Sequence, residues 1–336
     1  MRVVTVAEHG GPEVLRLSER DRPEAGPGQV LVEVAAAGVN FIDTYQRSGA
    51  YPMELPYVVG SEGAGTVVEV GPETSQISVG DRVAWAMVPG SGGSEYAVLP
   101  ADKAVPVPAG VQLDTAAAVM LQGMTAHYLV ESTYPAQAGQ TALVHAAAGG
   151  VGLLLVQMLA NKGVRVIGTT STPEKAERAR AAGAQEVVRY RSPGGDSAGG
   201  EQEQSVDLVA EVRRLTDDEG VDVVYDGVGR ATFEAGLSLL RPRGMMVLFG
   251  AASGPVPPMD PQALNTAGSV FLTRPSLAHY LQDRDELLWR SSDVLAAVDS
   301  GELAITVGAT YGLDEVADAH RDLESGGTSG KLLLVP

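Results

Sequence analysis

The sequence predicts an α/β protein with a β-rich domain and a doubly wound domain inserted before the last elements of the first. The chain has 336 residues and 44% hydrophobic residues, enough for two domains with cores of their own. Short strands and turns fill residues 1 to about 123, and strands alternate with helices from about 124 to 263. Residues 264–336 return to mixed structure and end in an apolar strand. Such a strand is expected to pair back into the first domain.

Residues 1–123 are expected to form an antiparallel, barrel-like β domain. Their β-branched segments are short and are separated by turn residues, as at Gly80–Asp81 before Val83. The expected strands are residues 3–8, 30–37, 65–70, 82–87 and 95–99.

Residues 124–263 are expected to form a parallel sheet covered by helices. Strands that alternate with helices of about 8–12 residues are typical of βαβ units. The expected strands are residues 141–146, 164–168, 186–190, 221–226 and 245–250, and the expected helices are residues 125–130, 153–162, 174–182, 208–215 and 233–240.

In the return segment we expect strands at 269–273 and 332–335 and helices near 284–300 and 313–325. Residues 192–205 read SPGGDSAGGEQEQS and offer almost nothing to bury, so they are expected to form a surface loop. A lid that serves the active site is the alternative for this loop.

Composition excludes several classes of function. The chain has no cysteine, and its five histidines are scattered, so neither a disulfide nor a transition-metal site is expected. A formal net charge of −18 disfavours nucleic acid and anionic membranes as partners. No apolar run approaches the roughly 18 residues that a membrane span needs, and the N-terminus does not resemble a secretory signal. We therefore expect a cytoplasmic protein.

The segment TALVHAAAGGVG carries the strongest chemical signal. A buried strand ends near Ala146 and is followed by Gly149, Gly150, Val151 and Gly152 and then by an apolar helix. This is a dinucleotide-binding fingerprint with its first glycine replaced by an alanine. The amide groups at the helix start are expected to bind a pyrophosphate. The alternative is a tight turn that binds no ligand.

The end of the next strand favours NADP over NAD. An NAD enzyme usually places an acidic residue there, but this chain has Thr170 and Ser171 and no acid. Lys175, one of the chain's few lysines, lies in the first turn of the next helix, where a cation opposes the helix dipole. A 2′-phosphate would explain its position, and a solvated helix lysine is the alternative.

Later strand ends are expected to line the rest of the cofactor site. Tyr190 follows the third strand and is expected either to flank the adenosine or to pack at the sheet edge. Phe249 and Gly250 end a later strand, where ligands bind in open α/β sheets, so we expect them near the nicotinamide.

Together these segments resemble the quinone oxidoreductase (zeta-crystallin-like) branch of the medium-chain dehydrogenase/reductase superfamily. The resemblance spans nearly the whole chain. The segments that carry it are GVNFIDTYQRSGAY at 38–51, VVGSEGAGTVVEVG at 58–71, VGDRV at 79–83, LQGMTAHYL at 121–129, HAAAGGVG at 145–152, YDGVG at 225–229, LTRPSLAHY at 272–280 and SGKLLLV at 329–335.

The resemblance implies a GroES-like catalytic domain, a Rossmann domain, NADPH as the hydride donor and a homodimer formed along the nucleotide-binding sheet. Zinc-dependent relatives carry a cysteine where Asn40 stands and a histidine where Ser61 stands, together with a lobe of four cysteines. This chain has none of these ligands, so the resemblance implies a zinc-independent member.

Carried over by position, the resemblance implies that Asn40, Tyr45 and Thr125 face the nicotinamide and its ribose. It places Lys175 and Tyr190 beside the adenosine phosphate, and it brings residues 329–331, including Lys331, toward the cofactor. Glu62 is expected to be structural. Asp43 is expected to be a turn or cap residue rather than a catalytic one.

These expectations favour hydride transfer to an acceptor with its own electron sink. A quinone needs only a hydrogen-bond donor for its developing oxyanion, and Tyr45 is the candidate donor, with Asn40 positioning the nicotinamide. Reduction of an enone or enal uses the same chemistry and stays open. A non-catalytic NADPH-binding protein, structural or RNA-binding, is a third hypothesis, which the acidic charge disfavours.

Overall fold

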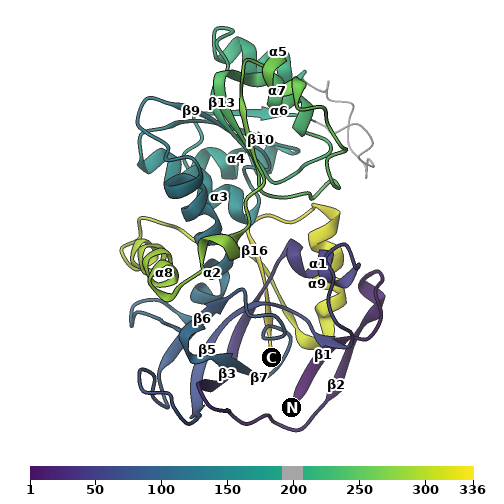
Figure 1. The fold of residues 1–336 in the computed structure, drawn as a ribbon, viewed down its shortest axis with the longest axis vertical. Coiled ribbons are helices and arrows are strands. Elements are labelled where there is room, and N and C mark those ends of the chain that lie inside the picture. Colours follow the sequence, from purple (N-terminus) through teal and green to yellow (C-terminus); the bar gives the residue numbers. More distant parts are fainter. Residues whose placement is uncertain (191–206) are drawn as a thin grey trace. The chain divides into compact units, whose positions relative to one another are not determined.

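The computed structural model describes residues 1–190 and 207–336 (Figure 1). The loop expected at 192–205 lies outside the described residues. The chain divides into two compact units, which are Met1–Thr125 with Tyr280–Pro336, and Ala126–His279.

Unit 1 contains two sheets among its described residues. The larger has the strand order β15–β16–β3–β5–β6–β8, with β7 also paired to β3, and its pairings are antiparallel except for the parallel pair β15 and β16. The smaller has the order β2–β1–β4. The strands are β1 (Arg2–Val6), β2 (Leu15–Glu19), β3 (Gln29–Val39), β4 (Tyr57–Val58), β5 (Glu62–Val70), β6 (Arg82–Ala86), β7 (Tyr96–Pro100), β8 (Val105–Pro106), β15 (Val307–Gly312) and β16 (Lys331–Val335).

The C-terminal strand β16 completes the larger sheet. Leu332, Leu333 and Leu334 pair with Val39, Gly38 and Ala37 of β3, so the last strand lies against one of the first. This pairing brings Lys331 next to the end of β3. The helices that accompany these sheets are α1 (Phe41–Arg47), α2 (Leu113–Tyr128, which continues into unit 2), α8 (Arg284–Asp299) and α9 (Val316–Ser325), with short helical turns η1 (Pro12–Val14), η2 (Ala101–Lys103) and η5 (Leu313–Glu315). The turn η4 (Leu277–Tyr280) begins in unit 2 and ends at the first residue of the second segment of unit 1.

Unit 2 is built on one parallel sheet with the order β11–β10–β9–β12–β13–β14. Helices α3 and α4 contact each other and β10, and α5 and α6 contact each other and the neighbouring strands (Figure 1). The strands are β9 (Thr141–Val144), β10 (Arg165–Thr170), β11 (Glu186–Arg189), β12 (Val221–Asp226), β13 (Leu240–Leu248) and β14 (Phe271–Thr273), and the helices are η3 (Leu129–Thr133), α3 (Gly150–Asn161), α4 (Pro173–Ala181), α5 (Leu208–Leu215), α6 (Phe233–Leu239) and α7 (Gln262–Thr266).

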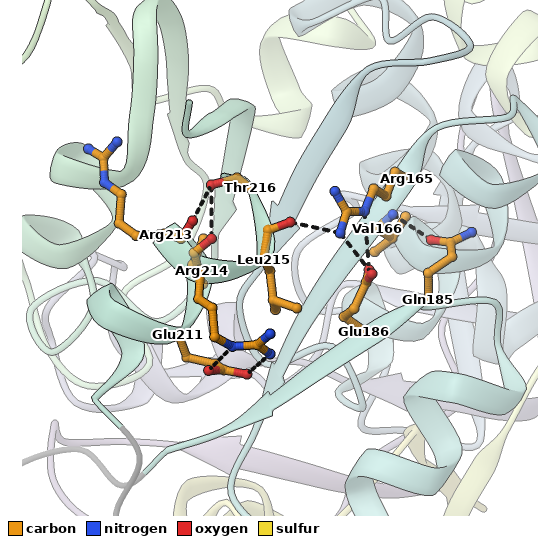
Figure 2. A network of polar contacts seen from close by, with 10 residues as sticks. Arg165, Val166, Gln185, Glu186, Glu211, Arg213, Arg214, Leu215 and Thr216 are labelled. Atoms are coloured by element: carbon orange, nitrogen blue, oxygen red, sulfur yellow. Dashed lines mark hydrogen bonds and ion pairs between the residues drawn. The ribbon is translucent and has the colours of Figure 1, made fainter. Parts of the chain in front are cut away.

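A polar network fastens the amino ends of the strands in unit 2 (Figure 2). Arg165, the first residue of β10, donates from Nη2 to Glu186 Oε1 at 2.8 Å and to the carbonyl oxygen of Leu215 at 2.9 Å. Gln185 Oε1 accepts from the backbone N–H of Val166 at 2.6 Å. These contacts join β10, β11 and the end of α5, and they leave the carboxyl ends of the strands for other contacts.

Several features of the fold differ from the sequence expectation, and they include strand β15, which was not expected. Strand β14 was expected in the return segment 264–336, but it pairs in parallel with β13, so residues 264–279 group with unit 2. The helix expected at 125–130 is the end of α2, which begins at Leu113. Helix α1 was not expected. The domain limits 1–123, 124–263 and 264–336 otherwise stay a prediction.

Candidate active site

The glycine turn between β9 and α3 brings the helix start very close to the preceding backbone. A Cβ built on Gly152 would lie 2.2 Å from the carbonyl oxygen of Ala146 and 2.9 Å from Ala147 Cα. Ala146 itself has a φ of 50°, which is uncommon for a residue other than glycine. The turn between β9 and α3 is therefore tight and strained, and residue 152 must be a glycine because no Cβ fits there.

The start of α3 has the electrostatic character of an anion site. The N-cap residue, Gly149, has no side chain to accept from the first amides, and the first turn contains no acidic residue. The first amide N–H groups of an α-helix have no acceptor within the helix, and they carry the positive end of its dipole. An anionic group placed at this helix start would satisfy these donors.

His145 lies under the turn and was not singled out from the sequence. It is 1% exposed, and its Nδ1 lies 3.0 Å from Thr169 Oγ1, while its Nε2 has no partner among the described residues. Burial lowers the pKa of His145, and the Asp226 carboxylate opposes that shift. The ring is therefore a neutral, buried packing element beneath the turn.

The end of β10 carries a buried hydroxyl at Thr170. Thr170 is 4% exposed, and its Oγ1 has no hydrogen-bond partner in the part of the chain that the structure describes. A buried donor without an acceptor costs free energy, commonly about 1–3 kcal/mol. Ser171, the next residue, is exposed. The carboxyl end of β10 thus offers two hydroxyl groups.

Helix α4 begins beside these hydroxyls, and its first turn contains one acid, Glu174, and one lysine, Lys175. Thr172 caps the helix by accepting from the backbone N–H of Lys175 at 3.3 Å. Burial lowers the pKa of Lys175, and the nearby Arg178 guanidinium lowers it further. Sequence reasoning missed Arg178, although its spacing of three residues from Lys175 on a helix would have indicated a shared face. A lysine whose protonation is disfavoured by burial and by a nearby guanidinium is suited to an anionic partner.

Tyr190 follows β11 at the same edge of the sheet. Its backbone N–H donates to the carbonyl oxygen of Thr170 at 3.1 Å, and its ring meets the His145 ring edge-on at a centroid distance of 6.3 Å. The ring also packs against the core of unit 2. The geometry gives Tyr190 a packing contact and places it next to the hydroxyls of β10.

The carboxyl ends of β12 and β13 approach each other closely. A Cβ on Gly250 would lie 2.4 Å from the carbonyl oxygen of Gly227, and a Cβ on Gly227 would lie 2.9 Å from the Phe249 ring. The buried Asp226 folds the turn after β12, because its Oδ1 accepts from the N–H groups of Val228 and Gly229 at 2.8 and 3.0 Å. The two glycines thus expose backbone at the end of the sheet.

In unit 1 the buried charges meet at Asn40. Lys331 Nζ lies 2.7 Å from Asn40 Oδ1 and 2.5 Å from Glu62 Oε2, and Asn40 Nδ2 lies 2.7 Å from that same Glu62 oxygen. The Lys331 and Glu62 side chains are 1% and 0% exposed. The structure therefore brings together two predicted site residues, Asn40 and Lys331, through Glu62, which was expected to be structural.

Asp43 sits at the first turn of α1, as a cap residue would. Its Oδ2 accepts from the backbone N–H of Asn40 at 2.8 Å, and its Oδ1 has no partner among the described residues. Burial raises the pKa of Asp43 to about 7, and the Asn40 N–H and the Lys331 ammonium oppose this shift. A buried carboxyl that titrates near neutral pH thus lies directly behind Asn40.

Helix α1 also carries Tyr45, and the last residue of the helix, Arg47, anchors the helix to α9. The Arg47 side chain is buried and donates from Nη1 to His320 Nδ1 at 3.1 Å and from Nη2 to Glu324 Oε1 at 2.6 Å, both on α9. The Tyr45 ring lies among aromatic neighbours, with its centroid 5.3 Å from that of Tyr51. Arg47 therefore holds the helix that presents Tyr45 and Asn40.

Thr125 is buried on α2, and its hydroxyl donates to the carbonyl oxygen of Leu121 at 2.7 Å. The hydroxyl oxygen keeps its acceptor capacity, so Thr125 is placed to accept rather than to donate. Residues 1–190 and 207–336 contain no group of three or more His, Cys, Asp or Glu side chains placed to hold a metal ion. In the same residues no helix is long and apolar enough for a membrane span.

The predicted site residues therefore fall into two groups, one in each unit. Unit 2 gathers the glycine turn, the hydroxyls of β10 and the start of α4 at the carboxyl ends of its strands. Unit 1 gathers Asn40 and Lys331, with Tyr45 on the helix that Asn40 begins.

Two family models match most of the chain. The model described as "Alcohol dehydrogenase GroES-like domain" matches residues 26–109, and the one described as "Zinc-binding dehydrogenase" matches residues 150–281. Among curated proteins, the chain is 42% identical to a "Quinone oxidoreductase" of Pseudomonas aeruginosa over 99% of both chains. It is also 39% identical to a "2-haloacrylate reductase" of a Burkholderia species, over 98% of both chains.

Solved structures show the same fold over the full length. A mycobacterial protein complexed with NADPH superposes with a TM-score of 0.93 at 48% identity, and 100% of each chain is covered. The Escherichia coli quinone oxidoreductase complexed with NADPH also gives a TM-score of 0.93, at 40% identity and with 100% of each chain covered.

Proposed function

The chain belongs to the quinone oxidoreductase branch of the medium-chain dehydrogenase/reductase superfamily, and from this premise we propose that it transfers hydride from NADPH to a quinone without zinc. One observation carries the proposal. A glycine turn and a second group of side chains suited to an anion lie at the same edge of the unit 2 sheet. That group consists of the Thr170 hydroxyl, which is buried and has no partner among residues 1–190 and 207–336, and a cation at Lys175.

The glycine turn fits the pyrophosphate of a dinucleotide. We propose that the amides of Gly149, Gly150, Val151 and Gly152 bind it, because these groups begin a twelve-residue helix with no acid in its first turn. The close approach that Gly152 permits keeps the helix start against the strand end. This is the arrangement that a dinucleotide requires.

The end of β10 and the start of α4 fit the 2′-phosphate that distinguishes NADPH from NADH. We propose that Thr170 and Ser171 donate hydroxyl groups and that Lys175, assisted by Arg178, supplies positive charge. A dianionic phosphate would relieve the mutual repulsion of the two cations and would give the Thr170 hydroxyl a partner. The strand end has no carboxylate to accept from a free ribose hydroxyl.

The remaining residues are assigned to the two ends of the cofactor. We propose that Tyr190 flanks the adenosine and that Phe249 and Gly250 offer backbone to the nicotinamide half, since all three follow strands at the carboxyl edge. We propose that Thr125 accepts a hydrogen bond near the nicotinamide, because its own proton is committed to Leu121.

NADPH supplies the hydride when it is bound. The chain's own contribution is to orient the nicotinamide through Asn40 and to donate a hydrogen bond from the Tyr45 hydroxyl to the oxygen that gains charge in the quinone. A tyrosine hydroxyl can donate one hydrogen bond, as this role requires. The buried network behind Asn40 holds that side chain still, so little reorganisation accompanies the transfer.

A stopped-flow assay tests the proposal directly. NADPH is mixed with the purified protein and with a panel of quinones, such as 1,2-naphthoquinone and 1,4-benzoquinone, and loss of absorbance at about 340 nm is followed. We expect saturable turnover with at least one quinone and much slower turnover with NADH. Binding of NADPH without turnover of any quinone would overturn the proposed activity.

An activated alkene is the second candidate acceptor. The similarity to a 2-haloacrylate reductase, over 98% of both chains, favours it, because that name describes reduction of a carbon–carbon double bond. Competition separates the two candidates. If an enal is reduced with a higher kcat/KM than every quinone in the panel, the alkene is the preferred acceptor. A non-catalytic NADPH-binding role would give NADPH binding without turnover of either class.

We also propose that the protein works in the cytoplasm as a homodimer. Strand β14 is the last strand of the unit 2 sheet in the described part of the chain, and its residue Phe271 is 57% exposed, so this edge offers apolar surface and a strand edge to a second copy. Sedimentation analysis at micromolar concentration tests the dimer, and a monomer there would contradict it.

A further inference from the structure

The side-chain amide of Asn40 contacts one buried charge of each sign, and the carboxyl of Asp43 contacts only its backbone N–H. Lys331 and Glu62 form an ion pair at 2.5 Å, with side chains 1% and 0% exposed, and both contact the Asn40 amide. Glu62 also accepts, through its other oxygen, from the backbone N–H of Leu121 on α2. A buried ion pair is tolerated when hydrogen bonds satisfy its remaining groups, and these contacts do so.

The two charges fix which way the amide of Asn40 points. An ammonium group can only donate and a carboxylate can only accept, so the amide oxygen must face Lys331 and the amide nitrogen must face Glu62. The distances agree, at 2.7 Å for each contact. A flipped amide would set its N–H groups against the Lys331 ammonium.

Both amide hydrogens of Asn40 are used inside the protein. Nδ2 donates to Glu62 Oε2 and, at 3.3 Å, to the carbonyl oxygen of Gly38. Oδ1 accepts from Lys331 and keeps one further lone pair. Asn40 can therefore offer a bound molecule an acceptor and no donor.

The ion pair of Lys331 and Glu62 has room because residue 38 of β3 is a glycine. A Cβ on Gly38 would lie 2.1 Å from Glu62 Oε2 and 2.5 Å from Lys331 Cε. Gly38 pairs with Leu333 in the sheet, so the same strand pairing that carries Lys331 to this place brings the glycine that accommodates it. The space for the ion pair thus depends on a residue with no side chain.

We propose that Lys331 is a positioning residue that holds Asn40 as an obligate hydrogen-bond acceptor. This inference rests on the proposed function, in which Asn40 faces the nicotinamide end of NADPH. The group recognised there must carry an N–H or O–H, as the carboxamide and the ribose hydroxyls do. Lys331 then acts through Asn40 and not by touching the cofactor, which differs from the role expected from the sequence.

An exchange of amide and carboxylate tests the inference most sharply. In Asn40→Asp/Glu62→Gln the cluster keeps one amide, one carboxylate and one ammonium. The introduced glutamine can donate to the new carboxylate while accepting from the Leu121 N–H, and the Lys331 ammonium must move off position 62 and pair with Asp at position 40. Position 40 stays an acceptor. We expect this variant to keep the rate of hydride transfer within about tenfold of the parent, whereas Asn40→Leu should lose on the order of 100-fold.

If position 40 must donate, the exchange variant will be as slow as Asn40→Leu, and the inference is overturned. Asn40→Asp alone places two carboxylates beside one ammonium and should be slower than the exchange variant. A single-turnover measurement with saturating NADPH reports hydride transfer separately from binding.

A second pair of variants keeps the test decisive if the exchange variant does not fold. Lys331→Met leaves a buried carboxylate unpaired, so its thermal stability should fall. Lys331→Met/Glu62→Gln removes both charges and should recover stability. The glutamine oxygen accepts from the Leu121 N–H, so its amide nitrogen faces Asn40 and no longer holds the Asn40 oxygen in its parental direction. We expect the double variant to fold and still transfer hydride roughly 10- to 100-fold more slowly. A parental rate in this double variant would overturn the inference.

Binding of 2′,5′-ADP separates this inference from the proposed function. The ligand carries only the adenosine half of NADPH, so its dissociation constant should be the same in the parent and in every variant at positions 40, 62 and 331. If the parent binds neither 2′,5′-ADP nor NADPH, the proposed function fails. Lys103→Met, a lysine outside the cluster, is the matched control and should behave as the parent does.

Discussion

The carbonyl oxygen of Ala146 would lie 2.2 Å from a Cβ on Gly152. The contact is with backbone, so no side-chain rotation can relieve it, and any larger residue must push α3 away from the end of β9. The distance between these two residues therefore sets whether the helix amides stand where a pyrophosphate could reach them.

We predict that Gly152→Val abolishes NADPH binding. The added side chain displaces the helix start, so the amides of 150–152 no longer converge on one anion. Fluorescence titration of NADPH should show no saturation in the concentration range that saturates the parent. Gly327→Val is the control, since a Cβ there meets only the Ser325 hydroxyl, at 3.2 Å. Unchanged NADPH affinity in Gly152→Val would refute the placement of the phosphate-binding turn.

We predict that Lys175→Ala weakens NADPH far more than NADH. A charge-assisted hydrogen bond to phosphate contributes roughly 1.5–3 kcal/mol, which corresponds to about a 10- to 100-fold change in the dissociation constant. NADH lacks the 2′-phosphate and should lose almost nothing. Lys162→Ala, which removes a lysine paired with Glu131 on the same unit, is the control. Equal losses for the two nucleotides would contradict the assignment of Lys175.

We predict that Tyr45→Phe lowers turnover and spares cofactor binding. The substitution removes only the hydroxyl and keeps the ring in its aromatic cluster with Tyr51. Loss of a hydrogen-bond or proton donor in the transition state commonly costs about 100-fold or more in rate. The steady-state kcat should therefore fall, while the NADPH dissociation constant should stay at the parental value. An unchanged kcat would remove Tyr45 from the reaction.

Acid should destabilise unit 1 through His320. Burial, reinforced by the Arg47 guanidinium, lowers the pKa of His320 to about 3. The folded state thus binds fewer protons than the unfolded chain, so the stabilisation is present above pH 6.5 and is lost as the pH falls toward 3. The slope is about 1.4 kcal/mol for each pH unit.

The His320→Gln variant tests this pH dependence, because glutamine can accept from Arg47 and does not titrate. Urea unfolding between pH 7 and pH 4 should show a shallower loss of stability in this variant than in the parent. His279→Gln, at an exposed position, should leave the slope unchanged. Identical slopes in His320→Gln and the parent would show that His320 is not the group responsible.

The sequence predicted the fold of unit 2 well because its signals are local. Strand, glycine turn and helix follow one another within residues 141–161, and each is set by neighbours in the chain. Helix α2 was predicted only at its end, because Leu113–Tyr128 is apolar on nearly all sides and lacks the periodicity that marks a half-exposed helix. Strand β15 was missed because it contains two glycines and several exposed positions, so its sequence shows no alternation of apolar and polar residues.

The candidate site was predictable where backbone geometry decides it and less so where distant side chains meet. Gly152 and Lys175 stand in recognisable local patterns. Lys331 and Asn40 are separated by 291 residues in the chain. Only the antiparallel pairing of β16 with β3 shows that the lysine lies against an asparagine and a glutamate. His145 gave no signal because its role depends on burial beneath the turn.

Calorimetric titration of the purified chain with NADP⁺ and with NAD⁺ tests the central claim most directly. The amides at the start of α3 and the cation on α4 predict saturable heat with NADP⁺, at one site per chain, and binding of NAD⁺ at least about tenfold weaker. Absence of saturable heat with NADP⁺, or equal affinity for the two nucleotides, would contradict the account.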